Sequence, residues 1–463
     1  SSSNSVLNSF SILSFKNLGN LFGSFSFGPY LKKVTFWLSI FLIIISFELF
    51  ASEKPRQNIL WLWIDDQSPW YGVYGDKRAQ TPNLDSLAAE GVVFERAYAP
   101  NPVCSSSRSA LITGAYSIRI GTHDHRSGRV PSYQIKLPEG FSTLPGLFRA
   151  EGYETFNNGK DDYNFSYSRA ELYSINTEES IVWDRGSVKE NPSGREAIQQ
   201  KRQQDRKSQE KTNYGKGPRG GGDWRDVPNN LYFFGQTYLS GGKQIHRDLH
   251  QQLIEKGYRP IEASEVIVPP QYPDILEVRR HIANHYNSIQ QTDYQLGQTI
   301  ARLKSDGLWN NTVIFLFSDH GSDLPRSKEY CYVEGLHVPL IIVASGMTDI
   351  VNPGTRRTDI VNLMDVTATS LALAGIQIPD SMDSQNLFAK SYSREYVFSS
   401  SDRSANVIDR IRSVIGSRFH YIKNFMTDRP LINWNHREMW ALENDNHDSI
   451  FLKIRNLANE KKL

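Results

Sequence analysis

Residues 58–66 read NILWLWIDD, and residues 313–320 read VIFLFSDH. Each begins as a continuous apolar run, the pattern of a parallel strand covered on both faces, and each ends abruptly in acidic residues. Between them, short apolar runs alternate with amphipathic stretches, of which residues 278–305 are the longest. This alternation predicts an α/β fold in which helices sandwich a large, mostly parallel sheet.

The remaining pattern divides the chain into regions. Further strands are predicted at residues 153–156 and 338–344, and further helices at residues 81–90, capped by Thr81, and 143–151. We expect a catalytic domain at residues 53–378, with a solvated insertion rich in Gln, Lys, Arg and Gly at about residues 195–228. The alternative for this insertion is a patch that binds a polyanionic substrate.

Shorter apolar runs at residues 396–399, 408–415 and 419–422 predict a smaller C-terminal α+β subdomain at residues 379–463. Whether this subdomain is complete, shortened or truncated stays open.

The amino-acid composition excludes several classes of protein. The 463 residues carry 52 Lys and Arg against 50 Asp and Glu, a net charge of +2, so no bulk charge points to a nucleic-acid partner. Hydrophobic residues make up 39% of the chain, enough for a sizeable core. The two cysteines, Cys104 and Cys331, are too few for a disulfide-stapled scaffold or a thiolate zinc cluster.

Residues 1–52 contain the features of a secretory leader. Lys32 and Lys33 precede an apolar run at residues 34–47, and small residues follow at 51–52. This pattern is typical of a cleaved signal peptide, the alternative being an uncleaved membrane anchor. Either predicts an exported protein, periplasmic or secreted. In an oxidising compartment, two cysteines that do not need each other suggest that one serves chemistry.

Acidic residues end both of the strongest strands: Asp65 and Asp66 end the first, and Asp319 followed by His320 ends the second. Open α/β sheets bind ligands at the carboxyl ends of their strands. Three carboxylates in one crevice repel each other unless a cation neutralises them, and hard oxygen ligands suit Ca²⁺ or Mg²⁺. The alternative role for a single acid pair that follows a strand is to cap a helix or to form a turn, without binding a metal.

A second candidate site lies at residues 104–114, which read CSSSRSALITG. Serines favour a helix N-terminus, and the following apolar residues would extend the helix. Cys104 and Arg108 are four residues apart, which places them on the same helical face. A helix N-terminus with an arginine is an anion site. The alternative is a buried cysteine beside a surface arginine.

These motifs, taken in order, resemble the formylglycine-dependent (type I) sulfatases of the alkaline-phosphatase-like superfamily. The resemblance runs from about residue 58 to residue 422 and rests on the order of its pieces rather than on any one of them. In family order these are residues 58–66, 81–91, 104–114, 159–160 and 318–321, then Lys328 before residues 334–339.

The resemblance implies that a maturation enzyme oxidises Cys104 to formylglycine, whose hydrate has two geminal hydroxyls. One oxygen attacks the sulfur of a sulfate ester, and the other expels sulfate as the carbonyl reforms. It also implies that Ca²⁺, with Mg²⁺ as the alternative, is held by Asp65, Asp66, Asp319 and His320 together with residue 104. Arg108, Lys160 and Lys328 would hold the sulfate oxygens.

The chain departs from the family pattern at several positions. Ser106 stands where Pro or Ala is usual, which puts recognition by the maturation enzyme in question. Asp162 stands where His is usual, so Asp162 itself, or His123 or His125, would transfer the proton. His320 stands where Asn is usual, and an imidazole is a poorer Ca²⁺ ligand than an amide oxygen.

A further active-site histidine of the family follows a Phe-Phe strand. Counting from Phe233 and Phe234 without gaps puts Lys243 at that position, with His246 three residues later as its rival. Either residue would protonate the leaving alcohol or bind sulfate. Lys243 is slightly favoured by the count.

The sequence therefore predicts an exported sulfatase that acts on a sulfated carbohydrate. One alternative keeps the fold and changes the reaction to phosphodiester or phosphonate hydrolysis. Another is a catalytically silent binder of sulfated glycans, if Ser106 prevents modification of Cys104.

Overall fold

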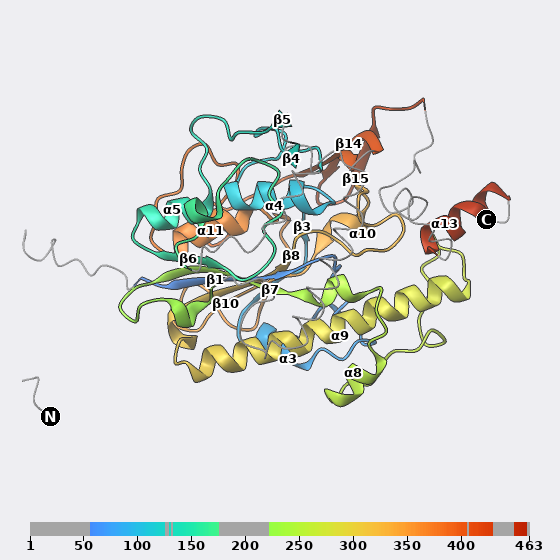
Figure 1. The fold of residues 1–463 in the computed structure, drawn as a ribbon, viewed down its shortest axis with the longest axis horizontal. Coiled ribbons are helices and arrows are strands. Elements are labelled where there is room, and N and C mark those ends of the chain that lie inside the picture. The colour runs from blue at the N-terminus through green and yellow to red at the C-terminus, as the bar shows by residue number, and fades with distance from the viewer. Residues whose placement is uncertain are drawn as a thin grey trace, which may run out of the picture. The chain divides into compact units, whose positions relative to one another are not determined.

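The fold is organised by β1 (Asn58–Ile64) and β8 (Thr312–Ser318), the two strands predicted from the longest apolar runs (Figure 1). This computed structural model describes residues 56–125, 129–130, 133–175, 222–404, 407–428 and 449–460. The predicted leader and most of the predicted insertion at about 195–228 lie outside these ranges. None of the helices in the described ranges has the apolar length that a bilayer crossing requires.

The main sheet has seven strands in the order β11-β2-β10-β8-β1-β7-β6. β1 pairs in parallel with β7 and β8, while β10 is antiparallel to both of its neighbours. The prediction of a mostly parallel sheet is therefore confirmed. The other strands of this sheet are β2 (Val92–Phe94), β6 (Glu154–Asn157), β7 (Phe233–Leu239), β10 (Leu340–Ala344) and β11 (Thr355–Arg357).

Helices cover both faces of this sheet because alternate side chains of each buried strand point to opposite sides. Trp61 and Trp63 of β1 pack in the core beneath α4 (Cys104–Thr113), α5 (Leu144–Ala150) and α11 (Asp365–Leu373). Leu60 and Leu62 pack in the opposite core against α3 (Pro82–Ala89) and α9 (Leu276–Ser305). The two helical layers are visible on either side of the sheet in Figure 1.

The helix predictions are confirmed with small shifts. The stretch predicted at residues 278–305 is α9, which buries apolar side chains at helical spacing. Thr143 caps α5, since its hydroxyl accepts from Gly146 N at 3.3 Å. Thr81 does not cap α3 with its side chain. Its hydroxyl accepts from Gly72 N at 3.0 Å instead, so the predicted cap is wrong in detail.

The predicted strand at residues 338–344 is divided at Pro339, which has no N–H for a ladder. Its first part is β9 (His337–Val338), and its second part is β10. β9 belongs to a small sheet of order β12-β3-β9, and β4 and β5 form a two-stranded one. The bounds are β3 (Ala97–Tyr98), β4 (Arg129–Val130), β5 (Tyr133–Gln134) and β12 (Val361–Asn362).

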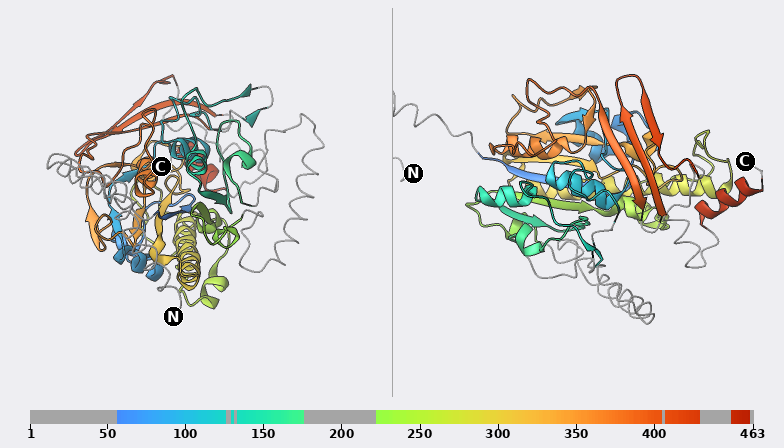
Figure 2. Two further views of the ribbon diagram at one scale, coloured as in Figure 1. Left: turned by 90° about the vertical axis from the view of Figure 1, so that its left-hand side faces the viewer. Right: turned by 90° about the horizontal axis from the view of Figure 1, so that it is seen from above.

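A separate antiparallel sheet follows, as the shorter apolar runs predicted: β13 (Val397–Ser404), β14 (Val407–Ile415) and β15 (His420–Asn424) (Figure 2). It packs against the chain near Cys104, where Asn101 Nδ2 donates to Ser400 O at 2.8 Å.

The remaining helices are α6 (Arg169–Leu172), α8 (His250–Glu255), α10 (Val333–Leu336), α13 (Ile450–Asn459) and the 3-10 turns η1 (Gly72–Tyr74), η2 (Trp224–Asp226), η3 (Ser240–Gln244) and η4 (Trp309–Asn311).

Candidate active site

The acidic residues predicted to converge do lie at one edge of the sheet. β1 and β8 are in parallel register, with Ile64 opposite Ser318, so the residues that follow each strand emerge side by side. Asp319 N donates to Ile64 O at 3.1 Å, and the side chains of Asp65 and Asp319 are fully buried. This edge therefore holds carboxylates that come from positions more than 250 residues apart in the sequence.

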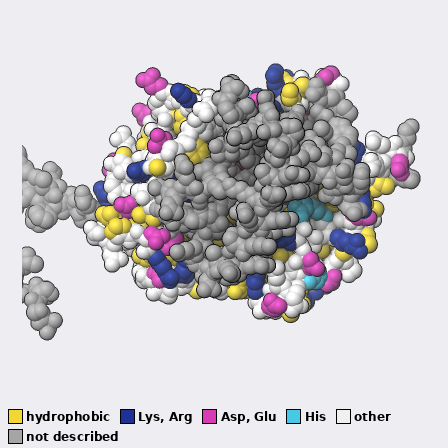
Figure 3. Space-filling model, viewed as in Figure 1, with side chains coloured by type: hydrophobic (Ala, Val, Ile, Leu, Met, Phe, Trp, Pro, Cys, Tyr) yellow, Lys and Arg dark blue, Asp and Glu magenta, His cyan; other side chains and the backbone are white. Residues whose placement is uncertain are grey.

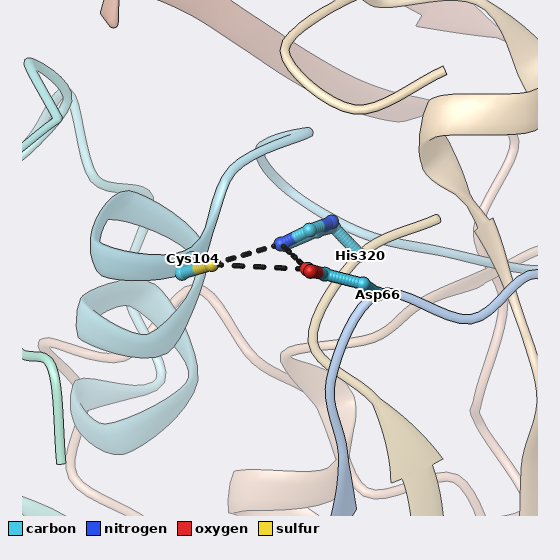
Figure 4. A group of neighbouring side chains, drawn as sticks. All are labelled: Asp66, Cys104 and His320. Carbon is cyan, nitrogen blue, oxygen red and sulfur yellow. Dashed lines mark hydrogen bonds and ion pairs between the residues drawn. The ribbon is translucent and has the colours of Figure 1, made fainter. Parts of the chain in front are cut away.

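Cys104 faces these acids from the first residue of α4 (Figure 4). Its Sγ lies 3.1 Å from His320 Nε2 and 4.0 Å from Asp66 Oδ1. His320 Nε2 lies 3.0 Å from Asp66 Oδ1, so the three side chains form a buried triangle. Asp66 has a φ of 58°, a left-handed backbone that turns its carboxylate back toward α4.

The serines after Cys104 fasten the start of α4 to its surroundings. Ser107 Oγ donates to Asp319 O at 2.6 Å, and Ser106 Oγ donates to His123 O at 2.9 Å. Ser105 Oγ lies 2.9 Å from His125 Nδ1, which places the predicted His125 against the residue next to Cys104. The structure thus gives Ser106, the unusual residue of the motif, a hydrogen bond of its own in the folded chain.

Arg108 lies on the same helical face as Cys104, as the spacing predicts, and it is wholly buried. Nη2 donates to Asp65 Oδ1 at 2.6 Å, Nε to Asp319 Oδ2 at 2.8 Å and Nη1 to Lys160 O at 2.8 Å. One guanidinium therefore bridges the carboxylates that end β1 and β8. Its partners are protein oxygens, whereas the resemblance implies a contact with sulfate.

Lysines surround the same carboxylates. Lys160, which follows β6, has its Nζ 3.3 Å from Asp65 Oδ2 and 3.0 Å from Asp162 Oδ2. Lys328 Nζ lies 2.8 Å from Asp66 Oδ1. These lysines come from two separate segments of the chain, and both point into the edge where the acids meet.

The structure brings Lys243 into this group and places His246 elsewhere. Lys243 Nζ contacts Asp66 Oδ2 and lies 3.8 Å from Cys104 Sγ. Gly242 permits this approach, because a Cβ there would lie 1.5 Å from Asp65 O. His246 Nε2 hydrogen-bonds instead to Asp323 Oδ2 at 3.1 Å, and half of its side chain is exposed.

Burial and charge shift the pKa values of the acids in opposite directions. Burial would raise the pKa of Asp65 and Asp66, but the neighbouring cations outweigh it and hold both well below the ordinary value. Burial and the charge of Asp65 raise the pKa of Asp319 to about 7, against the opposing effect of His320 and Arg108. Asp319 therefore keeps its proton more readily than Asp65 and Asp66, because burial and the adjacent Asp65 outweigh the cations next to it.

The pKa values of Cys104 and His320 are also shifted by the charged groups of this site. Burial would raise the pKa of the Cys104 thiol, but Lys160, Lys243, Lys328 and His320 together hold it well below its ordinary value. Burial would lower the pKa of His320, but Asp319, Cys104 and Asp66 outweigh it and raise the value to about 10. Position 104 therefore lies in a strongly positive field, which favours an anionic nucleophile.

The donor set fits a divalent cation. Two groups have ligand atoms within 4.8 Å of one another: Asp66, Cys104 and His320, and Asp65, Cys104 and Asp319. Three of these five side chains are carboxylates, the donors that Ca²⁺ and Mg²⁺ prefer, and all of them are buried.

Two side chains of the site were not predicted from the sequence. Tyr238, near the end of β7, donates from its hydroxyl to Asp65 Oδ2 at 2.9 Å. Trp63 lies under the guanidinium of Arg108. The rule that strand ends gather at one edge could have indicated Tyr238 once β7 was known to neighbour β1. No local pattern distinguishes Trp63 from the other apolar residues of its run.

The amino-acid sequence is similar to those of known sulfatases. A family model described as Sulfatase matches residues 57–376. An ulvan-active sulfatase of Formosa agariphila is 29% identical over 396 residues, which cover 82% of this chain and 63% of that relative. Human iduronate 2-sulfatase is 25% identical over 414 residues, which cover 74% of each chain. The match therefore spans less than two thirds of the Formosa relative.

Solved structures share the fold at low identity. A phosphonate monoester hydrolase of Agrobacterium radiobacter gives a TM-score of 0.58 at 16% identity, covering 80% of this chain and 87% of that one. A 2-O GAG sulfatase gives 0.55 at 19% identity, covering 88% and 92%. The family model spans well over half of the chain and includes Cys104 and both strand-end acid pairs. The chain therefore belongs to the sulfatase family of sulfuric ester hydrolases, with the alkaline-phosphatase-like fold.

Proposed function

We propose that this protein hydrolyses sulfate esters of a carbohydrate, with formylglycine made from Cys104 as the nucleophile. The observation that carries the proposal is the surrounding of Cys104. Its sulfur lies 3.8 Å from Lys243 and 4.0 Å from Asp66, at the meeting point of two strand ends and a helix N-terminus. Since only 2% of Cys104 is exposed, we place its conversion by the maturation enzyme before folding.

Asp65, Asp66 and Asp319, with His320, are the residues proposed to hold Ca²⁺, with Mg²⁺ as the alternative hard cation. A divalent cation bound there supplies Lewis acidity that polarises the sulfate and favours the ionised nucleophile. Arg108 is assigned to holding Asp65 and Asp319, because its N–H groups already donate to them. This assignment replaces the sulfate contact that the family resemblance implies for Arg108.

The lysines are assigned to the sulfate. Lys160 and Lys328 would neutralise the sulfate oxygens, whose charge grows in the transition state. One hydroxyl of the hydrated aldehyde gives its proton to solvent and its oxygen bonds to sulfur as the bond from sulfur to the alcohol oxygen breaks; the alcohol oxygen takes a proton from Lys243. The second hydroxyl then gives its proton to the neutral amine of Lys243, the bond from carbon to the sulfate oxygen breaks, sulfate leaves as the carbonyl reforms, and water hydrates the aldehyde.

We assign proton donation to Lys243 rather than to His246 or His125. Lys243 is next to Cys104, and about a third of its side chain is exposed toward solvent, where an alcohol would leave. His246 contacts Asp323, and His125 contacts Ser105. These histidines are therefore assigned to holding the loops around the site. Asp162, paired with Lys160, is assigned to orienting that lysine.

The proposed substrate class is a sulfated carbohydrate. Relatives in the comparison are named for ulvan, for iduronate and for N-acetylgalactosamine, and the last two are sugars. Export through the segment at residues 32–52 is part of the proposal, because it would bring the protein to an extracellular polymer. On the described surface in Figure 3, side chains of both charges are interspersed with hydrophobic ones, in keeping with a net charge of +2.

Two measurements test the proposal. The first is mass spectrometry of the peptide that contains Cys104, from protein made in its native host. An aldehyde at position 104 is expected, and an unmodified thiol would favour the silent glycan binder. The second compares rates on aryl sulfate and aryl phosphate esters. The fold shared with a phosphonate monoester hydrolase keeps that alternative in view, and faster turnover of the phosphate ester would replace the sulfatase assignment.

A further inference from the structure

The guanidinium of Arg108 is enclosed from its edges and from one face. The N–H groups along its edges donate hydrogen bonds to the carboxylates of Asp65 and Asp319 and to the carbonyl oxygen of Lys160, at 2.6 to 2.8 Å. Its flat face lies over the indole of Trp63, with 4.3 Å between Cζ and the ring centroid. Arg108 is 0% exposed and Trp63 is 1% exposed, so no water shell stabilises the cation. The indole is the electrostatic partner of its face.

The indole is itself held in one orientation. Trp63 Nε1 donates to Gln236 Oε1 at 2.8 Å, and Gln236 Nε2 donates to the hydroxyl of Tyr173 at 3.1 Å. Phe317 and Trp61 meet the ring edge-on, with centroids at 4.8 and 5.5 Å. A buried amide from β7 and the ring of Phe317 from β8 therefore hold the plane on which the guanidinium lies, and Trp61 adds one edge contact.

We propose that Trp63 is a positioning residue for the cation site: it sets the plane of Arg108, which in turn holds Asp65 and Asp319 for a divalent ion. Trp63 lies near the end of β1, two residues before Asp65, so a short stretch of backbone joins the platform to one of the proposed ligands. An aliphatic side chain there would remove the cation–π contact and leave a gap in which the guanidinium could tilt. The inference rests on the metal part of the proposed function.

β1 supplies a matched control in Trp61. It is on the same strand and the same sheet face as Trp63, and it is fully buried. Its Nε1 donates to Ser370 Oγ at 2.9 Å, and its ring packs edge-on against Phe234 and Phe317. The same substitution at Trp61 therefore removes a similar amount of buried aromatic surface and one edge contact to Trp63, but it keeps the hydrogen bond from Trp63 to Gln236 and the ring face that Trp63 presents to Arg108.

The test is Ca²⁺ titration by calorimetry on the purified full chain, with thermal unfolding measured in parallel. We expect Trp63→Leu to weaken Ca²⁺ binding about 10- to 100-fold, the range found when a group that orients metal ligands is lost. Trp61→Leu should destabilise the fold to a similar degree and leave the Ca²⁺ dissociation constant within about twofold of wild type. Equal Ca²⁺ affinities in the two variants would overturn the inference.

A second pair keeps the test decisive if the leucine variants do not fold. Trp63→Phe keeps an aromatic face but loses the N–H bond to Gln236, and we expect it to weaken Ca²⁺ binding at least about threefold, while Trp61→Phe does not. Equal Ca²⁺ affinities in the phenylalanine pair would also overturn it. If the wild type takes up neither Ca²⁺ nor Mg²⁺, the metal part of the proposed function fails together with the inference. If the wild type binds Ca²⁺ and both pairs behave alike, the inference alone fails.

Discussion

Lys328→Ala removes an ammonium group that the structure holds against Asp66, and we expect it to slow sulfate ester hydrolysis by about 10²- to 10³-fold. The Lys328 Nζ lies 2.8 and 3.0 Å from the two oxygens of Asp66, and 8% of its side chain is exposed. A charge in such a water-excluded place stabilises developing negative charge strongly, and the expected loss corresponds to about 2.7–4 kcal/mol of transition-state stabilisation.

The folded chain should tolerate this change. Asp66 keeps its contacts with Lys243 and His320, so its carboxylate is not left without a positive neighbour. We expect the far-UV circular dichroism spectrum to be unchanged and the melting temperature to fall only slightly. The loss should therefore be confined to kcat/KM.

The assay measures kcat and KM on an aryl sulfate for wild type, Lys328→Ala and a matched control. Lys304→Ala is that control, because Lys304 also pairs with a carboxylate at 3.0 Å but with 43% of its side chain exposed, and surface pairs contribute little. Rates are expressed per molecule of formylglycine, counted by mass spectrometry, so that incomplete maturation does not imitate a catalytic defect. Equal kcat/KM values for Lys328→Ala and Lys304→Ala would refute the assignment of Lys328 to the sulfate.

The remaining predictions concern the nucleophile, the proposed metal ligands and their support. Cys104→Ala should abolish turnover while the circular dichroism spectrum stays that of the wild type; residual turnover above about one hundredth of the wild-type rate would exclude position 104 as the nucleophile. Because the pKa of Asp319 in the metal-free site is about 7, this acid is protonated below that pH, and a bound cation must displace its proton. Ca²⁺ affinity should therefore rise about tenfold per pH unit between pH 5 and 7. The pKa of His320 is raised to about 10. If the logarithm of the Ca²⁺ affinity rises with pH at a slope near two instead of one, His320 also gives up its proton to bind the ion. A flat profile in Ca²⁺ titrations would contradict both residues as ligands. Tyr238→Phe should weaken Ca²⁺ binding several-fold, since it removes one hydrogen bond of about 1 kcal/mol to Asp65; an unchanged dissociation constant would show that Tyr238 does not orient Asp65.

Local patterns predicted much of the architecture because they act over a few residues. The continuous apolar runs at β1 and β8 reflect burial on both faces, and the spacing of apolar side chains in α9 reflects one buried helical face. The antiparallel direction of β10 was not predictable in this way. Its run is as apolar as that of a parallel strand, and direction depends on where the preceding segment places its start.

The order of motifs along the chain was sufficient to indicate the family, and the strand-end rule was sufficient to expect Asp65, Asp66 and Asp319 at one edge. The choice between Lys243 and His246 was different. Counting residues could not separate two candidates three positions apart, whereas the close approach of Gly242 to Asp65 directs Lys243 toward Cys104.

The sequence by itself determined which chemical groups this protein possesses and roughly where its strands and helices lie, because composition and periodicity are properties of the local chain. The tertiary structure decided which of those groups share a dielectric environment. It placed a guanidinium between two carboxylates and an indole beneath that guanidinium, and it raised one acid to a pKa of about 7 while holding its neighbours well below their ordinary values. Such effects depend on distance and burial in space, and no spacing along the chain encodes them.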